Sequence, residues 1–395
     1  MNDHEFQFSR RQFLQTSSAL GVGALLFRSP LWAAGEAPPQ VAKKRFGKTG
    51  VEVSQVGAGL MFDTRNAEVI LRTAHNHGVT YWDTAASYER MGSETGIGTF
   101  FEKHPEVRKD IFLVTKGRDD LAQSLEGSLS RMKTDHVELF FVHGIEAISE
   151  IDKPEVKAFA ERAKKDGKIK FFGFSTHTNM AACLSGAAKL GWLDGIMFTY
   201  NYREMHKPEM KAALDACEQA DFGLTAMKTL GGRSGSDTPA QTALLAPITA
   251  QGFTPAQAKL KTVMANPQID CACVQMPNMK FCRENIAAAL DRKELNGVVR
   301  SALDCHAEVT RNGYCAGCSH LCGAAVAGAV PVREVMRHLM YYHNYAELDA
   351  RAMFAEIPAE MRARLPHLDY SAAERACPHR LPIAQLMREA SVLLA

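Results

Sequence analysis

Short apolar runs alternate with amphipathic segments of helical periodicity along most of this chain. Strands that alternate with helices through short polar connections are typical of βα units and of a parallel sheet. Apolar runs of strand length predict the strands Val53–Met61, Val79–Asp83, Ile111–Lys116, Val137–His143, Ile169–Ser175, Gly195–Asn201, Phe222–Lys228 and Ile269–Gln275. Eight such units predict an α/β protein with a closed (β/α)8 TIM barrel.

Local signals near the last predicted strand support this division into elements. Thr254, Pro255 and Gln257 form a capping box with proline at the first helical position, and Asn266-Pro267 marks the end of that helix. The competing architecture is a doubly wound dinucleotide-binding fold, which requires a GxGxxG motif after its first strand. The first strand here ends in GAGLMF (57–62), which lacks the third glycine and therefore favours the barrel.

Both ends of the chain lie outside the predicted barrel. The segment SRRQFLQ (9–15) precedes an apolar run that is short for a membrane span, and it resembles a twin-arginine export signal. We expect cleavage after Ala33, a periplasmic location and contact with the membrane only during export; an uncleaved N-terminal anchor is the alternative. The predicted organisation is a signal peptide at 1–33, a barrel at 43–300 and a helical cysteine-containing domain at 301–395.

The length and the charge balance of the chain indicate which kinds of molecule it binds. The chain has 395 residues, enough for a barrel of about 250 residues and additional segments. Its 46 basic and 44 acidic side chains nearly balance, so no global field attracts nucleic acid or an anionic membrane surface. We therefore expect a small-molecule ligand and no nucleic-acid partner.

Four polar side chains lie in or just after the apolar runs, where strand ends converge on one face of a barrel. Lys116 is predicted to be buried, so it must pair with a carboxylate or lose its proton, and Asp83 is the available partner. A phenol beside an ammonium has a lowered pKa, which makes Tyr88 a candidate general acid. His143 can donate a hydrogen bond to a carbonyl oxygen on which negative charge develops. Together they predict an active site.

These residues and their surroundings resemble the aldo-keto reductase family. The segment WDTAASYERMGSETGIG (82–98) is similar to the family's strand and loop that carry Asp83 and Tyr88, and Lys116 and His143 follow in the family's order. The resemblance spans Lys43 to Arg300. It implies hydride transfer between a nicotinamide cofactor and a carbonyl or alcohol substrate, with Tyr88 as general acid or base, Lys116 and Asp83 tuning it and His143 binding the oxygen.

The same resemblance implies a site for NADP or NAD. Ser175 in GFSTH would hydrogen-bond the nicotinamide carboxamide. The pyrophosphate would lie along Lys228, Leu230 and Gly232, and the adenine would lie near Glu284 and Asn285. The chain departs from the family at Met197, where many relatives carry an amide side chain that binds the nicotinamide. Lys280 and Arg283 are candidates to recognise a 2′-phosphate, and a solvated basic pair is the alternative.

Cysteines cluster near the C-terminus. Cys315, Cys318 and Cys322 form C-x2-C-x3-C, and Cys377 lies in ACPHRLPI, a cysteine-proline unit like those at iron–sulfur sites. These motifs resemble the ferredoxin-like extension of some aldo-keto reductases, although the compact fourth cysteine of that motif is missing. We expect a [4Fe-4S] cluster, with zinc and disulfides as alternatives. The other cysteines are predicted to be buried thiols: Cys183, Cys217, Cys271, Cys273, Cys282 and Cys305.

The sequence thus favours an exported reductase of a small-molecule carbonyl compound, and the cysteine cluster suggests an electron-transfer partner. Two alternatives stay open. The first is an iron–sulfur-linked redox protein that uses the barrel pocket without free NADPH, and the second is a barrel that binds a partner without catalysis.

Overall fold

The computed structural model describes residues 37–232, 237–318, 321–345 and 350–395. The twin-arginine segment and its expected cleavage point lie outside these residues. No helix in the described ranges is long and apolar enough to cross a membrane.

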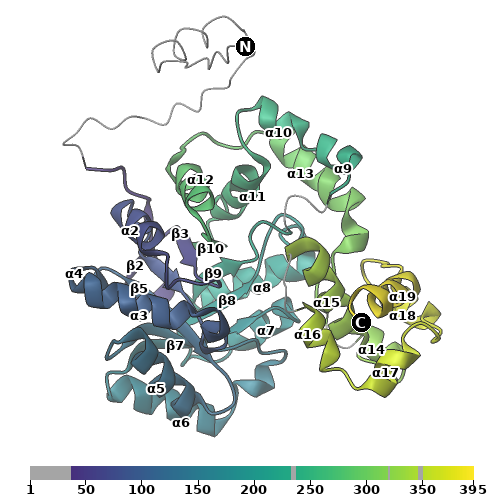
Figure 1. The fold of residues 1–395 in the computed structure, drawn as a ribbon, viewed down its shortest axis with the longest axis horizontal. Coiled ribbons are helices and arrows are strands. Elements are labelled where there is room, and N and C mark those ends of the chain that lie inside the picture. Colours follow the sequence, from purple (N-terminus) through teal and green to yellow (C-terminus); the bar gives the residue numbers. More distant parts are fainter. Residues whose placement is uncertain (1–36, 233–236, 319–320, 346–349) are drawn as a thin grey trace, which may run out of the picture. The chain divides into compact units, whose positions relative to one another are not determined.

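The centre of the molecule is a closed barrel of eight parallel strands, as the apolar runs predicted (Figure 1). The strands follow the order β10-β3-β4-β5-β6-β7-β8-β9, and β10 closes the ring by pairing with β3. They are β3 (Val56–Gly59), β4 (Tyr81–Asp83), β5 (Phe112–Gly117), β6 (Val137–Val142), β7 (Ile169–Thr176), β8 (Gly195–Thr199), β9 (Gly223–Met227) and β10 (Cys271–Gln275). Because both faces of these strands are buried, their sequences are nearly continuous apolar runs.

The single strand predicted at Val53–Met61 is wrong in one respect, because the chain breaks it in two. β2 (Glu52–Ser54) pairs antiparallel with β1 (Lys43–Arg45) in a separate two-stranded sheet, and only β3 enters the barrel. The Ser54 hydroxyl accepts hydrogen bonds from the backbone N–H groups of Thr80 and Tyr81, at 3.0 and 3.1 Å, and donates to the Val56 carbonyl. These bonds turn the chain between β2 and β3.

The turn after β1 closes the N-terminal end of the barrel. Phe46 is fully buried and packs against the rings of Tyr81 and Phe112. A Cβ at Gly223 would lie 2.3 Å from the Phe46 ring, so this strand needs glycine to admit the ring. One end of the barrel is therefore filled, and ligands must use the other end.

Helices surround the barrel on the outside (Figure 1). They are α2 (Glu68–Asn76), α3 (Ser93–Lys103), α4 (Pro105–Arg108), α5 (Leu121–Met132), α6 (Pro154–Lys165), α7 (Met180–Ala187), α8 (Pro208–Gln219), α11 (Pro255–Met264) and α12 (Met279–Leu290). The short helices α9 (Pro239–Ala243) and α10 (Ala246–Ala250) lie farther from the strands, beside residues 297–309 (Figure 1). The capping box at Thr254 and Gln257 is present at α11, and this helix ends before Asn266 as predicted.

The C-terminal region is helical, as predicted, and has a core of its own. Its helices are α13 (Gly297–Val309), α14 (Leu321–Ala325), α15 (Val332–Tyr345), α16 (Ala350–Ala355), α17 (Ala359–Arg364), α18 (Ser371–Ala376) and α19 (Ile383–Leu393). α13 continues across residue 300 and packs on Tyr202, Leu245 and Ile248 of the barrel side. The separate core begins at Tyr314. We call residues 314–395 the extension.

Candidate active site

The four polar residues predicted from the sequence meet at the C-terminal ends of neighbouring strands. Asp83 is the last residue of β4, Lys116 is the penultimate residue of β5, and His143 directly follows β6. Tyr88 lies in a 3₁₀ turn (Ala86–Met91) that follows β4. Because β4, β5 and β6 are paired in parallel, their ends share one rim of the barrel.

A buried ion pair forms the base of this site. Lys116 Nζ donates to Asp83 Oδ1 at 2.6 Å and to the Thr84 carbonyl at 2.8 Å. The two side chains are only 1% and 8% exposed. A buried ammonium is stable only when it is paired and hydrogen-bonded, and both conditions are met here.

Opposing effects act on the pKa of the Asp83 carboxyl. Burial raises its pKa above the ordinary value, while the charge and hydrogen bond of Lys116 and a hydrogen bond with Cys273 lower it. Cys273, on β10, was predicted only as a buried thiol. This contact of the site was not predicted, because the first four residues of β10 are all buried and a continuous apolar run does not show which side chains face the barrel interior.

Tyr88 lies between the ammonium and the imidazole. Lys116 Nζ is 5.2 Å from the centroid of the Tyr88 ring. The rings of Tyr88 and His143 meet edge to face, with centroids 5.8 Å apart and planes at 85°. Tyr88 as a whole is half-buried at this rim. The contacts bring a phenol, an ammonium and an imidazole together.

His143 is held as a neutral donor. Burial, followed by the charges of Lys116 and Arg118, lowers its pKa to about 3. The Ser87 hydroxyl lies 3.3 Å from Nδ1. With that hydroxyl as donor, the ring carries its single proton on Nε2, which can then donate to a carbonyl oxygen. The site thus combines a neutral hydrogen-bond donor with a phenol beside a cation.

Ser175, predicted to bind the nicotinamide, lies beside the catalytic rim. It is fully buried near the end of β7, and its hydroxyl accepts a hydrogen bond from the backbone N–H of Gly144 at 3.0 Å. Gly144 directly follows His143, so Ser175 adjoins the tetrad. Met197 is buried in the barrel interior, where it offers no amide to a cofactor.

The residues predicted for the pyrophosphate and the adenine follow β9 and β10. Lys228 has a left-handed backbone with φ of +53°, and Leu230 and Gly232 continue the same loop. Asn285 is buried on α12 and donates to the carbonyl of Gln275 at the end of β10, at 3.0 Å. The remaining predicted positions lie on α12 as well: Glu284 is half-buried, and Lys280 and Arg283 are exposed. Their roles stay predictions.

His177 is a residue of this rim that the sequence analysis missed, although it lies within the quoted GFSTH motif. Its Nδ1 lies 3.0 Å from the Thr199 hydroxyl. Burial lowers its pKa well below the ordinary value, and the charges of Lys228 and Arg337 add to that effect. Arg337 belongs to α15, so a cation of the extension acts on a residue of the barrel rim.

The four clustered cysteines line one small cavity in the extension. Cys315, Cys318, Cys322 and Cys377 face it together with His379. Burial raises the pKa of Cys318 to about 11, and the other three thiols add to the shift. Within the described ranges, no group of three or more His, Cys, Asp or Glu side chains is arranged to hold a metal ion.

All ten cysteines are free thiols, so the structure has no disulfide among them. Five of the six cysteines outside the cluster are buried as predicted. Cys305 is exposed instead, because α13 turns Ala302, Leu303 and His306 inward and leaves Cys305 on its outer face.

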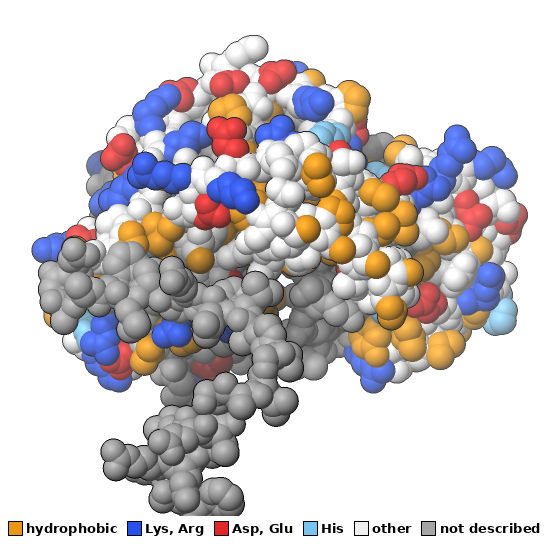
Figure 2. All heavy atoms as spheres, turned by 90° about the horizontal axis from the view of Figure 1, so that it is seen from above, with side chains coloured by type: hydrophobic (Ala, Val, Ile, Leu, Met, Phe, Trp, Pro, Cys, Tyr) orange, Lys and Arg blue, Asp and Glu red, His pale blue; other side chains and the backbone are white. Residues whose placement is uncertain are grey.

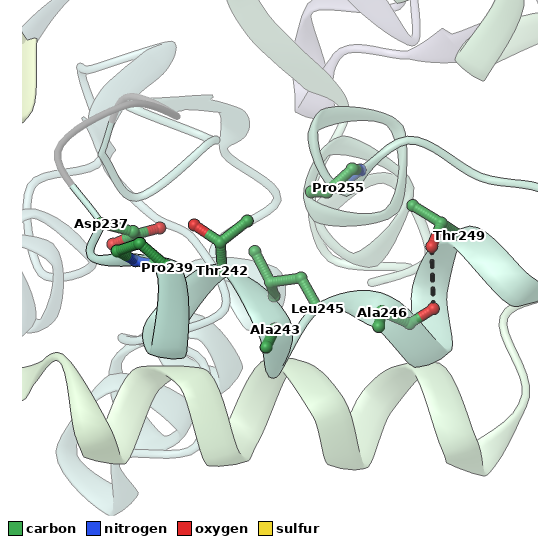
Figure 3. Close-up of a pocket in the computed structure, with 8 residues that line it drawn as sticks. All are labelled: Asp237, Pro239, Thr242, Ala243, Leu245, Ala246, Thr249 and Pro255. Carbon is green, nitrogen blue, oxygen red and sulfur yellow. Dashed lines mark hydrogen bonds between the residues drawn. The ribbon is translucent and has the colours of Figure 1, made fainter.

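The surface charge and one hollow away from the rim also bear on where a ligand binds. Figure 2 shows basic and acidic side chains interspersed on one face, in agreement with the balanced composition. Figure 3 shows a hollow lined by residues of α9, α10 and the start of α11. Its lining is small or apolar apart from two threonines and Asp237, and Asp237 Oδ2 lies 2.9 Å from His306 Nε2. The barrel rim is therefore the better candidate for chemistry.

Comparisons with known proteins agree with this geometry. Residues 54–300 match the model of the Aldo/keto reductase family. The uncharacterized oxidoreductase YqkF of Bacillus subtilis is 31% identical over 153 residues, which are 34% of this chain and 48% of that protein. The NADP(+) aldo-keto reductase yakc of Schizosaccharomyces pombe is 25% identical over 182 residues, which are 42% and 52% of the two chains. This chain thus spans about half the length of these relatives.

Solved structures show the same fold. An aldo-keto reductase from Klebsiella pneumoniae in complex with NADPH has a TM-score of 0.56 at 23% identity, and the match covers 67% of this chain and 94% of that one. The thermostable aldo-keto reductase Tm1743 has a TM-score of 0.55 at 24% identity, and the match covers 67% and 99%. About a third of this chain therefore lies outside either match.

Proposed function

The chain belongs to the aldo/keto reductase family, and from this premise we propose that it is an NAD(P)-dependent oxidoreductase acting on a small-molecule carbonyl or alcohol. The observation that carries the proposal is the assembly of Asp83, Tyr88, Lys116 and His143 on one rim of the barrel. A binding module would have no use for a buried ammonium beside a phenol, so the family membership and this geometry favour catalysis.

The roles of the four residues follow from their contacts. When bound, the nicotinamide supplies a hydride to the carbonyl carbon or takes one from the alcohol. In reduction, the Tyr88 hydroxyl gives its proton to the carbonyl oxygen, and the Lys116 ammonium stabilises the phenolate that remains. His143 is neutral and donates a hydrogen bond that orients the same oxygen. Oxidation reverses the proton transfer.

Asp83 keeps Lys116 in place. Without a carboxylate at 2.6 Å, Lys116 would be buried with no opposite charge, which is costly, and nothing would hold its charge beside the Tyr88 ring. Asp83 thus acts through Lys116.

The residues present fit a nicotinamide cofactor. Ser175 offers a buried hydroxyl beside the tetrad, and Lys228 offers a cation on the loop after β9. NADP is the better candidate because one relative is named for NADP(+) and one structural neighbour holds NADPH. Lys280 and Arg283 are exposed near the start of α12, where a 2′-phosphate could be recognised.

The test is direct. The purified chain is mixed with NADPH or NADH and a panel of aldehydes and ketones, and hydride transfer is followed by the loss of nicotinamide absorbance. We expect carbonyl-dependent oxidation of NADPH. Tight binding of neither nucleotide, together with no turnover of any carbonyl, would overturn the proposal.

We further propose that Cys315, Cys318, Cys322 and Cys377 bind a [4Fe-4S] cluster, with electron transfer to or from a partner. Support comes from the four thiols around one cavity and from the absence of disulfides. In such a cluster each cysteine binds its own iron, so the sulfurs need not converge on one point. A single zinc ion needs ligands that converge on one point.

Metal analysis tests the cluster. Protein purified without oxygen should contain about four irons with matching sulfide per chain. A stoichiometric zinc content, or no metal, would overturn this proposal and leave the proposed reductase activity unaffected.

The expected export is proposed on the sequence alone. Arg10 and Arg11 of SRRQFLQ would direct the folded chain to the periplasm. Cell fractionation of the native protein and of a variant with both residues changed to lysine tests it. Retention of the variant in the cytoplasm supports export by this pathway, and equal distribution of the two proteins contradicts it.

A further inference from the structure

One side chain of the extension reaches the rim of the barrel. Arg337 lies on α15, and the backbone of Gly317 lies between it and His177. A Cβ at Gly317 would lie 2.7 Å from Arg337 Nη1 and 2.6 Å from the His177 carbonyl oxygen. The backbone N–H of Asn179 also donates to the Gly317 carbonyl at 3.0 Å. Arg337 is therefore placed beside the rim by the docking of the extension.

Among the residues that the structure describes, no acidic side chain balances the charge of Arg337. The residue is only 9% exposed. Its guanidinium faces the ring of Tyr341 at 5.1 Å and donates to the hydroxyl of the same residue. No carboxylate of the described residues lies within ion-pairing distance of it. A buried charge without an opposite charge is costly, so this position favours an anion.

Arg333, one turn earlier on the same helix, shows the contrast. Its guanidinium is about equally buried but pairs with Glu146 at 2.6 Å and with Glu334. The helix therefore carries one arginine that is neutralised by protein carboxylates and one that is not. This makes Arg333 a matched control for Arg337.

The surroundings of Arg337 on the rim side are also positive. Lys228 Nζ lies 4.8 Å from the centroid of the same Tyr341 ring. His177 is close enough to both cations for their charges to act on it: burial, followed by the charges of Lys228 and Arg337, lowers its pKa well below the ordinary value. Two cations that share one aromatic ring form a local positive field at the mouth of the barrel. The Cys315 sulfur lies near Arg337 as well and would carry negative charge as a ligand of the proposed cluster, so the iron content of an Arg337 variant separates a role at the cysteine site from a role at the rim.

We propose that Arg337 binds an anionic group of the ligand held at the barrel rim, so that the extension completes the site. The chemistry is a phosphate or a carboxylate, which matches the planar fork of a guanidinium. The source is either the pyrophosphate of the cofactor or an acidic group of the carbonyl substrate. This inference rests on the proposed function and adds a residue that the barrel alone lacks.

The experiment uses the full chain with Arg337→Gln, Arg337→Lys and the control Arg333→Gln. Three quantities are measured: the Kd for NADPH, the Kd for inorganic pyrophosphate, and kcat/KM for paired aldehydes that differ only in a carboxylate. Circular dichroism and iron content verify that each variant keeps its fold and its cysteine site.

If the anion is the pyrophosphate, Arg337→Gln raises both Kd values by about 10- to 100-fold, as expected for a hydrogen bond to a charged group. If the anion belongs to the substrate, both Kd values stay constant, and kcat/KM falls by a similar factor for the carboxylated aldehyde only. In both cases Arg337→Lys keeps part of the binding or turnover that Arg337→Gln loses. Arg333→Gln changes each value less than twofold.

The proposal is overturned if Arg337→Gln changes none of these values by more than twofold, or if Arg333→Gln changes them equally. It is also overturned if Arg337→Gln lowers only the iron content, because Arg337 would then serve the cysteine site. Pyrophosphate binding does not require turnover. Loss of that binding in Arg337→Gln would therefore support the inference even if the wild-type chain reduced no carbonyl.

Discussion

Buried cations have different partners in the barrel and in the extension. In the barrel, Lys116 meets Asp83 at 2.6 Å inside a ring of fully paired strands. In the extension, Arg337 donates to a phenol, and four thiols line one small cavity. The charge of Lys116 is therefore neutralised within the barrel, whereas the described residues of the extension leave the charge of Arg337 and the four thiols to a ligand.

Most described α-helices of the extension are short, whereas in the barrel region only α4, α9 and α10 of the described α-helices are that short. The helices α14, α16, α17 and α18 have only five or six residues each. Isolated helices shorter than about 12 residues are marginal in water, so these depend on the packing around Tyr314, Cys377 and their neighbours. We infer that the barrel is stable by its own core, while the extension depends on what its cysteines bind.

The largest expected effect is a loss of turnover at the barrel site without a loss of the fold. Tyr88→Phe removes the proton donor, so turnover should fall by roughly 10²- to 10⁴-fold. Tyr200→Phe is the control, because its hydroxyl accepts from Asn266 at 2.7 Å outside the site. Steady-state kinetics of both variants check this prediction. Turnover of Tyr88→Phe within a factor of two of wild type would remove Tyr88 from the mechanism.

The next prediction tests how much the buried ion pair of Lys116 and Asp83 contributes to stability. Lys116→Met leaves Asp83 buried without a cation, so the free energy of unfolding should fall by about 3–5 kcal/mol. In the control Lys133→Met, the lost partner Glu102 is 55% exposed, and the change should stay below about 1 kcal/mol. Urea unfolding measures both. Equal losses of unfolding free energy in the two variants would contradict the difference expected between a buried and an exposed ion pair.

A third prediction concerns the dependence of the extension on its cysteines. Cys318→Ser should lower the iron content and make the extension sensitive to protease, while the barrel is cleaved no faster. Cys305→Ser, at an exposed position outside the cavity, should behave like wild type. Limited proteolysis with mass spectrometry locates the cuts. Cleavage throughout the barrel in Cys318→Ser would show that the two regions are not independent.

The smallest effect is a dependence of stability on pH that originates at the barrel rim. The pKa of His143 is about 3 in the folded chain and about 6.5 ordinarily. Between these values the unfolded chain binds the proton and the folded chain does not, so stability falls as the pH is lowered from 6.5 towards 3. His143→Gln should reduce this slope by up to about 1.4 kcal/mol per pH unit.

Urea unfolding between pH 4.5 and 7 checks the slope. His177 contributes in the same direction, because its pKa is also lowered, so the slope should decrease without vanishing. An identical slope in His143→Gln and wild type would show that His143 is not buried as the structure places it.

The pattern of apolar runs predicted the barrel because strands that are buried on both faces leave continuous apolar segments. The prediction failed at Val53–Met61, where two strands of different sheets follow one another. Their separation depends on Ser54 bonding to backbone groups of Thr80 and Tyr81, and such contacts between distant segments leave no periodicity in the sequence.

The sequence by itself determined the four polar residues of the rim, because each one ends or follows an apolar strand and parallel strands bring their ends together. It also determined the four clustered cysteines through their spacing. Only the tertiary structure decided that His143 is neutral, that Cys273 contacts Asp83 and that Arg337 reaches the rim. These features depend on burial and on the docking of α15, which are set by contacts between segments far apart in the chain.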